Sequence, residues 1–239
     1  MTKLSVNINK IATIRNARGG ELPSVTEAAI KLQEFGAQGI TIHPRPDQRH
    51  ITRKDVYDLK PLVHTEFNIE GNPHRAFIDM VLEVKPDQVT LVPDGEDAIT
   101  SNAGWDCEYN LEFLKLVIAE FKEAGIRTSI FLDPNPEMVK FAKETGADRI
   151  ELYTEAYATN YPKNKEEAIK PYIATALEAE KYGLGINAGH DLSLENLKYF
   201  ADNIPNLLEV SIGHALISEA LYMGLENTVQ AYLKRLAKW

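Results

Sequence analysis

Short runs of apolar, mostly β-branched residues alternate along the chain with longer segments in which apolar residues recur every three or four positions. The short runs are typical of buried strands, and the longer spacing is typical of amphipathic helices. The pattern predicts eight strands, at residues 4–9, 39–43, 66–70, 88–92, 127–132, 149–153, 184–187 and 208–212. Between them it predicts helices at residues 25–35, 76–84, 111–124, 136–145, 165–182, 194–203 and 217–237.

This alternation indicates a fold of the α/β class. Strands that alternate with helices pair in parallel through crossover connections, and eight such units in 239 residues fit a closed (β/α)8 barrel, the TIM barrel. We therefore expect a single barrel domain over residues 1–239, with additional short helices in the loops. The second choice is a doubly wound open sheet, which is disfavoured because no Gly-x-Gly-x-x-Gly motif follows the first strand.

Polar residues gather at the carboxyl ends of the predicted strands, which in this fold meet at the face that carries active sites. They are Asn7, Asn9, Lys10, His43, Arg45, Glu70, Glu151, Asn187, His190, Gly213 and His214. Four of the six histidines, His43, His50, His190 and His214, fall at or just beyond strand ends. One histidine alone could simply bond a neighbouring carbonyl group, but four at one face favour a functional site.

The stretch 39–50 joins a buried strand to a basic loop. Its apolar run gives way to a segment that contains two prolines, two arginines and two histidines. The prolines end the strand pairing and stiffen the loop, and the cations gather where an anionic ligand could be held.

Glu70 closes a strand in which alternation sends Glu66, Asn68 and Glu70 to one side. In a barrel that side can be the interior, which would put Glu70 at the mouth. A partly desolvated carboxylate near histidines suits general acid/base catalysis, and the simpler alternative is a salt bridge to an arginine at the mouth. Glu151 has the same two interpretations.

The turns at residues 187–190 and 212–215 follow the last two strands, where barrels often hold a phosphate on backbone N–H groups. Each Gly-His turn alone could be an ordinary strand-to-helix connection. The arginines Arg15, Arg18, Arg45 and Arg49 could add bidentate contacts, although Arg18 could equally be a solvated loop charge.

Composition narrows the classes of function. The net charge of −9 argues against non-specific binding to nucleic acid or to an acidic membrane surface, so an anion site must be locally basic. The single cysteine, Cys107, excludes an internal disulfide framework and suits a reducing cytoplasm. No signal peptide is evident, and no apolar segment approaches the roughly 18 residues of a membrane helix. We expect a soluble, cytoplasmic protein.

Segments 6–18, 49–51, 67–70, 150–154, 187–190 and 212–215 together resemble the pyridoxine 5′-phosphate synthase family, in order and over essentially the whole chain. The resemblance implies a (β/α)8 barrel that condenses 3-amino-2-oxopropyl phosphate with 1-deoxy-D-xylulose 5-phosphate. The products would be pyridoxine 5′-phosphate, inorganic phosphate and water, in vitamin B6 biosynthesis. It also implies a homo-octamer built from dimers and no organic cofactor or metal.

By position, the resemblance implies that His43 and Glu70 are catalytic bases, that His190 is the proton donor, and that Glu151 stabilises charged intermediates. The aminoketone phosphate would be held by Asn7, Arg18, Gly213 and His214, and the deoxyxylulose phosphate by Arg45, His50 and Thr100.

The chain departs from the family pattern at two places near these phosphates. Most members have Asp-His where this chain has Asn9-Lys10, so the contact to the sugar phosphate is chemically altered. The glycine that usually follows the histidine of the seventh strand is here Asp191, whose carboxylate would repel a phosphate unless it points away.

The residues leave three other functions open. One is a Schiff-base aldolase or isomerase on the same barrel, with Lys10 as the amine. Another is a metal-dependent hydrolase that uses the histidines and Glu70, disfavoured because no His-x-His pair lies at a strand end. The third is a protein that binds sugar phosphates without turnover.

Overall fold

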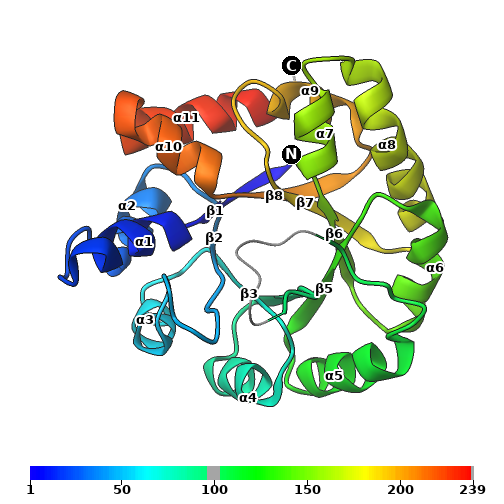
Figure 1. Cartoon of the computed structure of the whole chain (residues 1–239), viewed down its shortest axis with the longest axis horizontal. Helices are drawn as coiled ribbons and strands as arrows, with labels where there is room; N and C mark the ends of the chain where they lie inside the picture. The colour runs from blue at the N-terminus through cyan, green and yellow to red at the C-terminus, as the bar shows by residue number, and fades with distance from the viewer. Residues whose placement is uncertain (96–102, 238–239) are drawn as a thin grey trace.

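The computed structural model describes residues 1–95 and 103–237. Eight parallel strands close into a barrel in chain order, with β8 paired to β1, and helices form a ring around them (Figure 1). The predicted (β/α)8 fold is confirmed. The strands are β1 (Lys3–Asn7), β2 (Gly39–Ile42), β3 (Glu66–Gly71), β4 (Gln88–Leu91), β5 (Arg127–Leu132), β6 (Arg149–Tyr153), β7 (Gly185–His190) and β8 (Leu207–Ile212).

The helices follow the strands and are bounded by residues suited to helix ends. Ser24 caps α2 by accepting a hydrogen bond from the Glu27 N–H, and Thr52 and Asp55 form a capping box at α3. The helices are α1 (Asn9–Arg18), α2 (Val25–Glu34), α3 (Arg53–Leu59), α4 (Arg75–Val84), α5 (Leu111–Glu123), α6 (Pro136–Glu144), α7 (Glu155–Asn160), α8 (Lys165–Lys181), α9 (Leu197–Asn203), α10 (His214–Met223) and α11 (Leu225–Leu236).

Several predicted boundaries differ from the structure, and two of them differ for a clear local reason. The first strand, expected to run to Asn9, ends at Asn7, because the Asn7 side-chain oxygen accepts a hydrogen bond from the Asn9 N–H (3.0 Å) and α1 begins there. The helix expected over 217–237 is divided into α10 and α11 at Gly224, whose φ of 79° interrupts the helical backbone.

The apolar core lies between the strands and the helices, and the barrel interior is polar. Buried Ile40 and Ile42 of β2 belong to the main apolar cluster. The alternate positions form a hydrogen-bonded belt across neighbouring strands. In this belt Ser5 bonds Thr41 (2.7 Å), Asn68 donates to Thr41 (3.3 Å), and Thr90 donates to Asn68 (3.0 Å). Barrels of this fold are usually filled by branched apolar side chains. This barrel instead has polar side chains inside, and buried polar groups are stable when they are hydrogen-bonded.

At the amino ends of the strands, a cluster of charged residues surrounds Glu66. Its carboxylate pairs with Lys3 (3.4 Å) and with Arg127. Burial and the neighbouring Glu66 raise the pKa of Glu209 well above its usual value. Burial opposes ionisation of Glu66, but the hydrogen bond with Glu209 and the positive charges of Arg127, Arg149 and Lys3 lower its pKa below the usual value.

None of the helices within residues 1–95 and 103–237 combines the length and the apolar character needed to cross a membrane.

Candidate active site

The carboxyl ends of the strands bring their polar side chains together at the barrel mouth. The Asn7 amide donates to one oxygen of Glu70 (3.4 Å), and the Ser211 hydroxyl donates to the other (3.4 Å), which links β1, β3 and β8. Glu151 lies close enough to Glu70 for the two charges to interact. His43 and His190 interact through their charges in the same way. The four side chains to which the family resemblance gives catalytic roles therefore share one site.

Glu70 is a buried carboxyl group with few partners. Burial raises its pKa to about 8, the Ser211 hydrogen bond opposes this shift, and the charges of Asp94 and Glu209 add to it. The protonated and ionised forms are therefore both accessible near neutral pH. A group of this kind can take up or release a proton during a reaction.

Glu151 lies beside Glu70 in the barrel interior, and a glycine makes room for it. Burial and the charge of Glu70 raise the pKa of Glu151 well above its usual value. A Cβ atom added at Gly189 would lie 2.2 Å from the Glu151 carboxylate oxygen Oε1, so no larger residue fits there without displacing the carboxylate. Gly189 of β7 thus lets the Glu151 side chain extend across the neighbouring strand.

His43 follows β2 and is buried at the mouth, 7% exposed. Its backbone N–H donates to the side-chain oxygen of Asn9 (3.0 Å), which fixes the loop against the start of α1. Burial, together with the positive charge of Arg45 and the neighbouring His50, lowers the pKa of His43 well below its usual value. The imidazole is therefore neutral at physiological pH, the form that can accept a proton.

His190 ends β7 in a backbone conformation that is uncommon for a side chain other than glycine, with φ of 98°. Its Nδ1 atom contacts the carboxylate of Asp191. Its ring meets the ring of Tyr153 edge to face, with centroids 5.1 Å apart. These two contacts hold the imidazole on the β6 side of the mouth.

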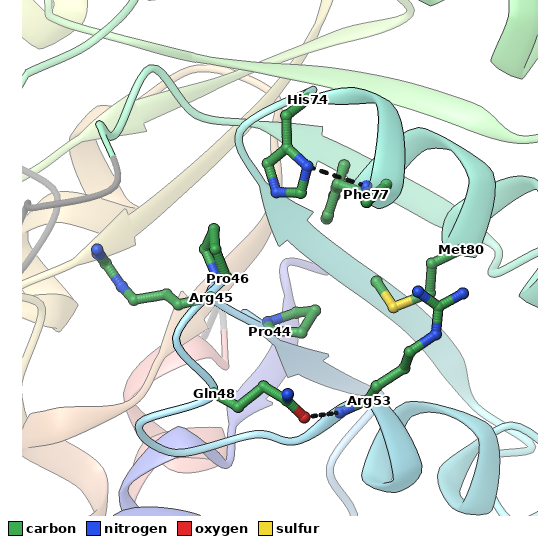
Figure 2. A pocket seen from close by; sticks show the side chains of 9 residues that line it. Pro44, Arg45, Pro46, Gln48, Arg53, His74, Phe77 and Met80 are labelled. Atoms are coloured by element: carbon green, nitrogen blue, oxygen red, sulfur yellow. Dashed lines mark hydrogen bonds between the residues drawn. The ribbon is translucent and has the colours of Figure 1, made fainter.

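Arg45 extends from the loop after β2 and pairs with Asp94 after β4, with 2.7 Å between the guanidinium and the carboxylate. The outer side of this loop borders a pocket of about 130 Å³ lined by Pro44, Pro46, Phe77 and Met80, among others. Figure 2 shows the Arg45 side chain directed away from Phe77 and Met80. Thr100, predicted to bind the same phosphate, lies outside the described residues.

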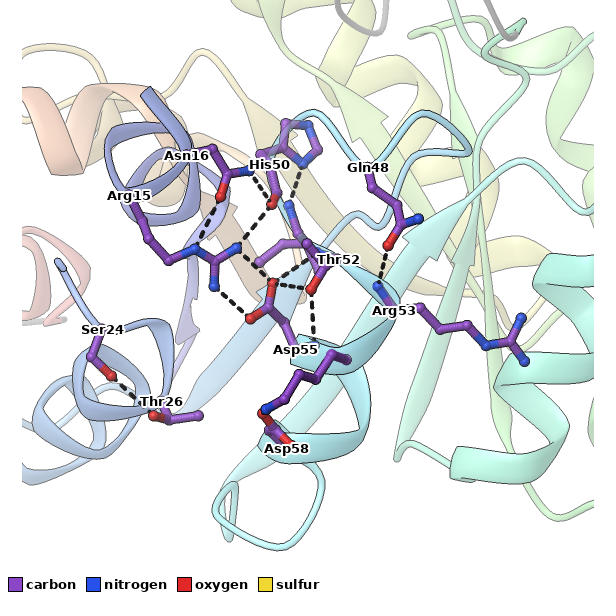
Figure 3. Close-up of polar contacts among 12 residues, drawn as sticks. Arg15, Asn16, Ser24, Thr26, Gln48, His50, Thr52, Arg53, Asp55 and Asp58 are labelled. Atoms are coloured by element: carbon purple, nitrogen blue, oxygen red, sulfur yellow. Dashed lines mark hydrogen bonds and ion pairs between the residues drawn. The ribbon is translucent and has the colours of Figure 1, made fainter. Parts of the chain in front are cut away.

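A buried ion pair supports the far end of the same loop (Figure 3). Arg15 of α1 binds both carboxylate oxygens of Asp55 (2.5 and 2.8 Å) and donates to the backbone oxygen of His50 (3.2 Å). The Asn16 amide donates to the same oxygen (2.8 Å). Arg15, which the sequence offered as a phosphate ligand, therefore fixes the loop that carries His50.

The His50 ring is held in one tautomer. Its Nδ1 atom accepts a hydrogen bond from the Ile51 N–H (3.0 Å), which leaves Nε2 to carry the proton of the neutral ring. Burial and the positive charges of Arg45 and Lys10 lower the pKa of His50 to about 4, so the ring is neutral at physiological pH. A neutral Nε2–H group can donate to an anionic oxygen without adding charge.

The remaining residues that were predicted to bind substrate lie at helix ends around the mouth. Gly213 precedes α10 and packs against Asn7, since an added Cβ atom would lie 3.1 Å from the Asn7 Cβ. His214 is the first residue of α10, whose amino end favours anions. Arg18, the last residue of α1, and Lys10 are both exposed.

Several residues of the mouth escaped the sequence analysis. Ser211 and Asp94 set the environment of Glu70, and Val92, Phe131 and Tyr153 form a small apolar cluster of their own. The alternation of β6 places Tyr153 on the same side as Glu151, a signal that could have identified it. For Asp94, which pairs with Arg45 across two strand ends, the sequence contained no such pattern.

Comparisons with known proteins agree over the whole chain. The family model of "Pyridoxal phosphate biosynthesis protein PdxJ" matches residues 4–238. A pyridoxine 5′-phosphate synthase from Bacteroides thetaiotaomicron is 65% identical over 232 residues, which cover 97% of this chain and 98% of the relative. One from Flavobacterium johnsoniae is 65% identical over 236 residues, which cover 99% of this chain and 100% of the relative.

Solved structures of other enzymes share the fold at low sequence identity. Thiamine phosphate pyrophosphorylase from Pyrococcus furiosus superposes with a TM-score of 0.63 at 13% identity, covering 98% of this chain and 95% of its own. Phosphoribosyl anthranilate isomerase from Thermotoga maritima superposes with a TM-score of 0.60 at 14% identity, covering 99% and 98%. These similarities concern the fold alone.

The buried ion pair under the basic loop leads to a stability prediction. Asp55→Asn leaves the Arg15 guanidinium without its charged partner, so we expect the free energy of unfolding to fall by about 3 kcal/mol. Asp58→Asn is the matched control on the same helix, because its pair with Lys54 is exposed and should contribute at most about 0.5 kcal/mol. Urea denaturation at neutral pH measures both, and equal losses in the two variants would contradict the assignment.

The raised pKa of Glu70 leads to a prediction about stability and pH. The folded protein retains this proton up to about pH 8, whereas the unfolded chain releases it near 4.5. The stability contributed by Glu70 therefore falls as pH rises through that window. Glu70→Gln cannot titrate, so at pH 8 it should exceed the wild type by about 4 kcal/mol, while at pH 4.5 the two should be similar.

Urea denaturation at pH 4.5 and pH 8 tests this, with Glu112→Gln, an exposed carboxyl on α5, as the control. A difference between Glu70→Gln and wild type that is the same at both pH values would show that the Glu70 proton does not contribute.

Proposed function

Because the chain belongs to the family of PdxJ, the pyridoxal phosphate biosynthesis protein, it functions as a pyridoxine 5′-phosphate synthase in vitamin B6 biosynthesis, and we propose that the barrel mouth is its active site. The proposed substrates are 3-amino-2-oxopropyl phosphate and 1-deoxy-D-xylulose 5-phosphate. The observation that best supports this site is the convergence of His43, Glu70, Glu151 and His190 on one mouth, with the pKa values of the first three displaced.

The reaction requires repeated proton transfers at different atoms. The amine of one substrate must add to a ketone of the other, and water and inorganic phosphate must leave as the adduct is converted to the ring. A set of acid and base groups around one pocket can supply these transfers. Two anchored phosphates would also hold the reacting carbons together, which removes much of the entropic barrier to a two-substrate condensation.

We assign the proton transfers from the state of each side chain. Neutral His43 acts as a base at physiological pH, and Glu70, which titrates near 8, acts as a second base once ionised. His190 acts as the proton donor, at the edge of the mouth beside Tyr153. Glu151, buried and close to Glu70, stabilises positive charge that develops on the intermediates.

The sugar phosphate is proposed to bind where the loop after β2 meets the end of β1. Arg45 and the neutral His50 Nε2–H supply donors, and Thr100 adds a hydroxyl group. Exposed Lys10 supplies a further positive charge close to His50. Asn9 contributes by position, since its side-chain oxygen accepts the His43 N–H and so sets the distance between phosphate and base.

The aminoketone phosphate is proposed to bind on the opposite side of the mouth. Gly213 and His214 offer the amino end of α10, where backbone N–H groups and the helix dipole favour an anion. The Asn7 amide lies directly beneath, and Arg18 supplies a cation. The Asp191 carboxylate contacts His190, so its charge is directed at the imidazole and not at this phosphate.

The proposed assembly is a cytoplasmic homo-octamer built from dimers, as the family resemblance implies. Exposed apolar side chains at α1 and α10 support subunit contacts there. Ile14 is 45% exposed, and Leu221 and Tyr222 are 71% and 91% exposed. The two helices pack against each other, so these side chains are available on one side of the barrel.

The direct test incubates the purified protein with both substrates. We expect pyridoxine 5′-phosphate and inorganic phosphate to appear in equal amounts, with neither product when one substrate is omitted. Borohydride added during turnover, followed by peptide mapping, would label Lys10 if the protein were instead a Schiff-base aldolase. Binding of both substrates without product by folded protein would reject the synthase and favour a binding protein.

The acid/base assignments predict the loss of turnover in single variants. His190→Gln and Glu70→Gln each remove an ionisable group, so kcat should fall by at least about 100-fold while circular dichroism stays native. His64→Gln is the control, because His64 is exposed near a helix boundary and its ring contacts the Leu62 backbone oxygen, away from the barrel mouth. Near-normal kcat in His190→Gln or Glu70→Gln would reject that residue's role.

A further inference from the structure

We propose that Asp191 is a positioning residue for catalysis, and that its carboxylate holds the His190 ring by Nδ1 and stabilises the protonated ring as the proton donor. This inference rests on the proposed function of His190 and adds a second residue to that role.

The two side chains are adjacent in sequence and in contact. The Asp191 carboxylate oxygen Oδ2 meets His190 Nδ1, and the two side chains are 38% and 28% exposed. Carboxylate–imidazole contacts of this kind fix the tautomer and the ring orientation, because the bonded nitrogen must carry a proton. Nε2 is therefore the atom from which His190 can transfer a proton to a substrate.

The backbone of Asp191 is anchored independently of its carboxylate. Its N–H donates to the hydroxyl of Thr154 (3.3 Å), and its carbonyl oxygen accepts from the Asn196 amide (3.3 Å). The same Thr154 hydroxyl donates to the Gly189 oxygen (2.7 Å). One buried threonine therefore bonds the residues immediately before and after His190, an arrangement we call the Thr154 clamp. The carboxylate is thus aimed at the ring from a fixed base.

The conformation of His190 also indicates that its position is imposed by these neighbours. A φ of 98° at a residue with a side chain is strained and persists only where surrounding contacts outweigh the strain. The Thr154 clamp, the Tyr153 ring edge at 5.1 Å between centroids and the Asp191 carboxylate are such contacts.

The charges around the ring make the carboxylate the main stabiliser of the imidazolium. From β2, His43 interacts unfavourably with a charged His190. From β6, Tyr153 presents its ring edge, the carboxylates of Asp94, Asp133 and Glu155 act on that tyrosine, and Glu151 lies behind Gly189. Of these groups, the Asp191 carboxylate is in direct contact with the His190 ring.

The proton balance is simple. The imidazolium gives its Nε2 proton to the oxygen that leaves the substrate, and that oxygen departs as water. The neutral ring keeps its Nδ1–H bonded to Asp191, and the carboxylate stays ionised throughout. A proton from solvent or from another step restores the imidazolium.

The test compares Asp191→Asn and Asp191→Glu with the wild type in steady-state kinetics. Asp191→Asn can still accept the Nδ1–H bond but lacks the charge, so kcat should fall about 10-fold or more, the size of effect found for groups that orient a functional histidine. KM for each substrate should change less than about twofold. Asp191→Glu should recover part of kcat.

The pH profile separates a catalytic effect from a structural one. If the carboxylate stabilises the protonated ring as proposed, the alkaline limb of kcat should lie at lower pH in Asp191→Asn than in the wild type. Glu155→Gln is the matched control, because it removes an exposed charge just after β6 whose carboxylate accepts a hydrogen bond from Thr159 (2.8 Å), and its profile should match the wild type.

The outcomes are distinct from those that test the proposed function. An Asp191→Asn profile that superimposes on the wild type, with kcat within about twofold, overturns the positioning role even though His190→Gln is inactive. A similar loss in Glu155→Gln also overturns it, since any nearby charge would then suffice. An active His190→Gln variant rejects the proposed proton donor itself. Should Asp191→Asn not fold, Asp191→Ser supplies the same comparison.

Discussion

The site depends on two carboxyl groups, Glu70 and Glu151, buried side by side within the barrel. Burial and the charge of Glu70 raise the pKa of Glu151, while burial and the charges of Asp94 and Glu209 raise the pKa of Glu70. Both cannot ionise cheaply, so the pair retains a proton near neutral pH. Other features follow from this constraint. Gly189 leaves room for one carboxylate, and Asn7 and Ser211 hold the other by one hydrogen bond each.

The polar interior that accommodates these groups limits where the fold can gain stability. The belt through Ser5, Thr41, Asn68 and Thr90 replaces the branched apolar layers usual in this fold. Buried hydrogen bonds contribute little net stability compared with apolar burial. The layer between strands and helices must therefore provide most of it, and that layer is where the main apolar cluster lies. Because the apolar layer between strands and helices stabilises the barrel, the interior can carry polar side chains that serve catalysis.

The sequence predicted the barrel and its mouth because both depend on local periodicity. Alternation in residues 66–70 correctly directed Glu70 inward, where Asn7 and Ser211 meet it. The pairs Arg45–Asp94 and Arg15–Asp55 could not be predicted, since they join residues that only barrel closure brings together. The sequence analysis missed helix α1 because it extended the first strand to Asn9. In the structure the Asn7 side-chain oxygen accepts a hydrogen bond from the Asn9 N–H, where the helix begins. Long-range pairing decided which arginines remain at the mouth.

These arginine pairs explain how a chain with a net charge of −9 can hold anionic substrates. Arg15 pairs with Asp55 and donates to the backbone oxygen of His50. Its role is therefore structural, because it fixes the backbone at His50. Arg45 is held by Asp94, which limits its motion and lowers the charge that a phosphate would meet. Neutral His50 donates without charge. In the proposed phosphate site, affinity would come from fixed donors more than from excess charge, which would let the site release a phosphate product as well as bind a phosphate substrate.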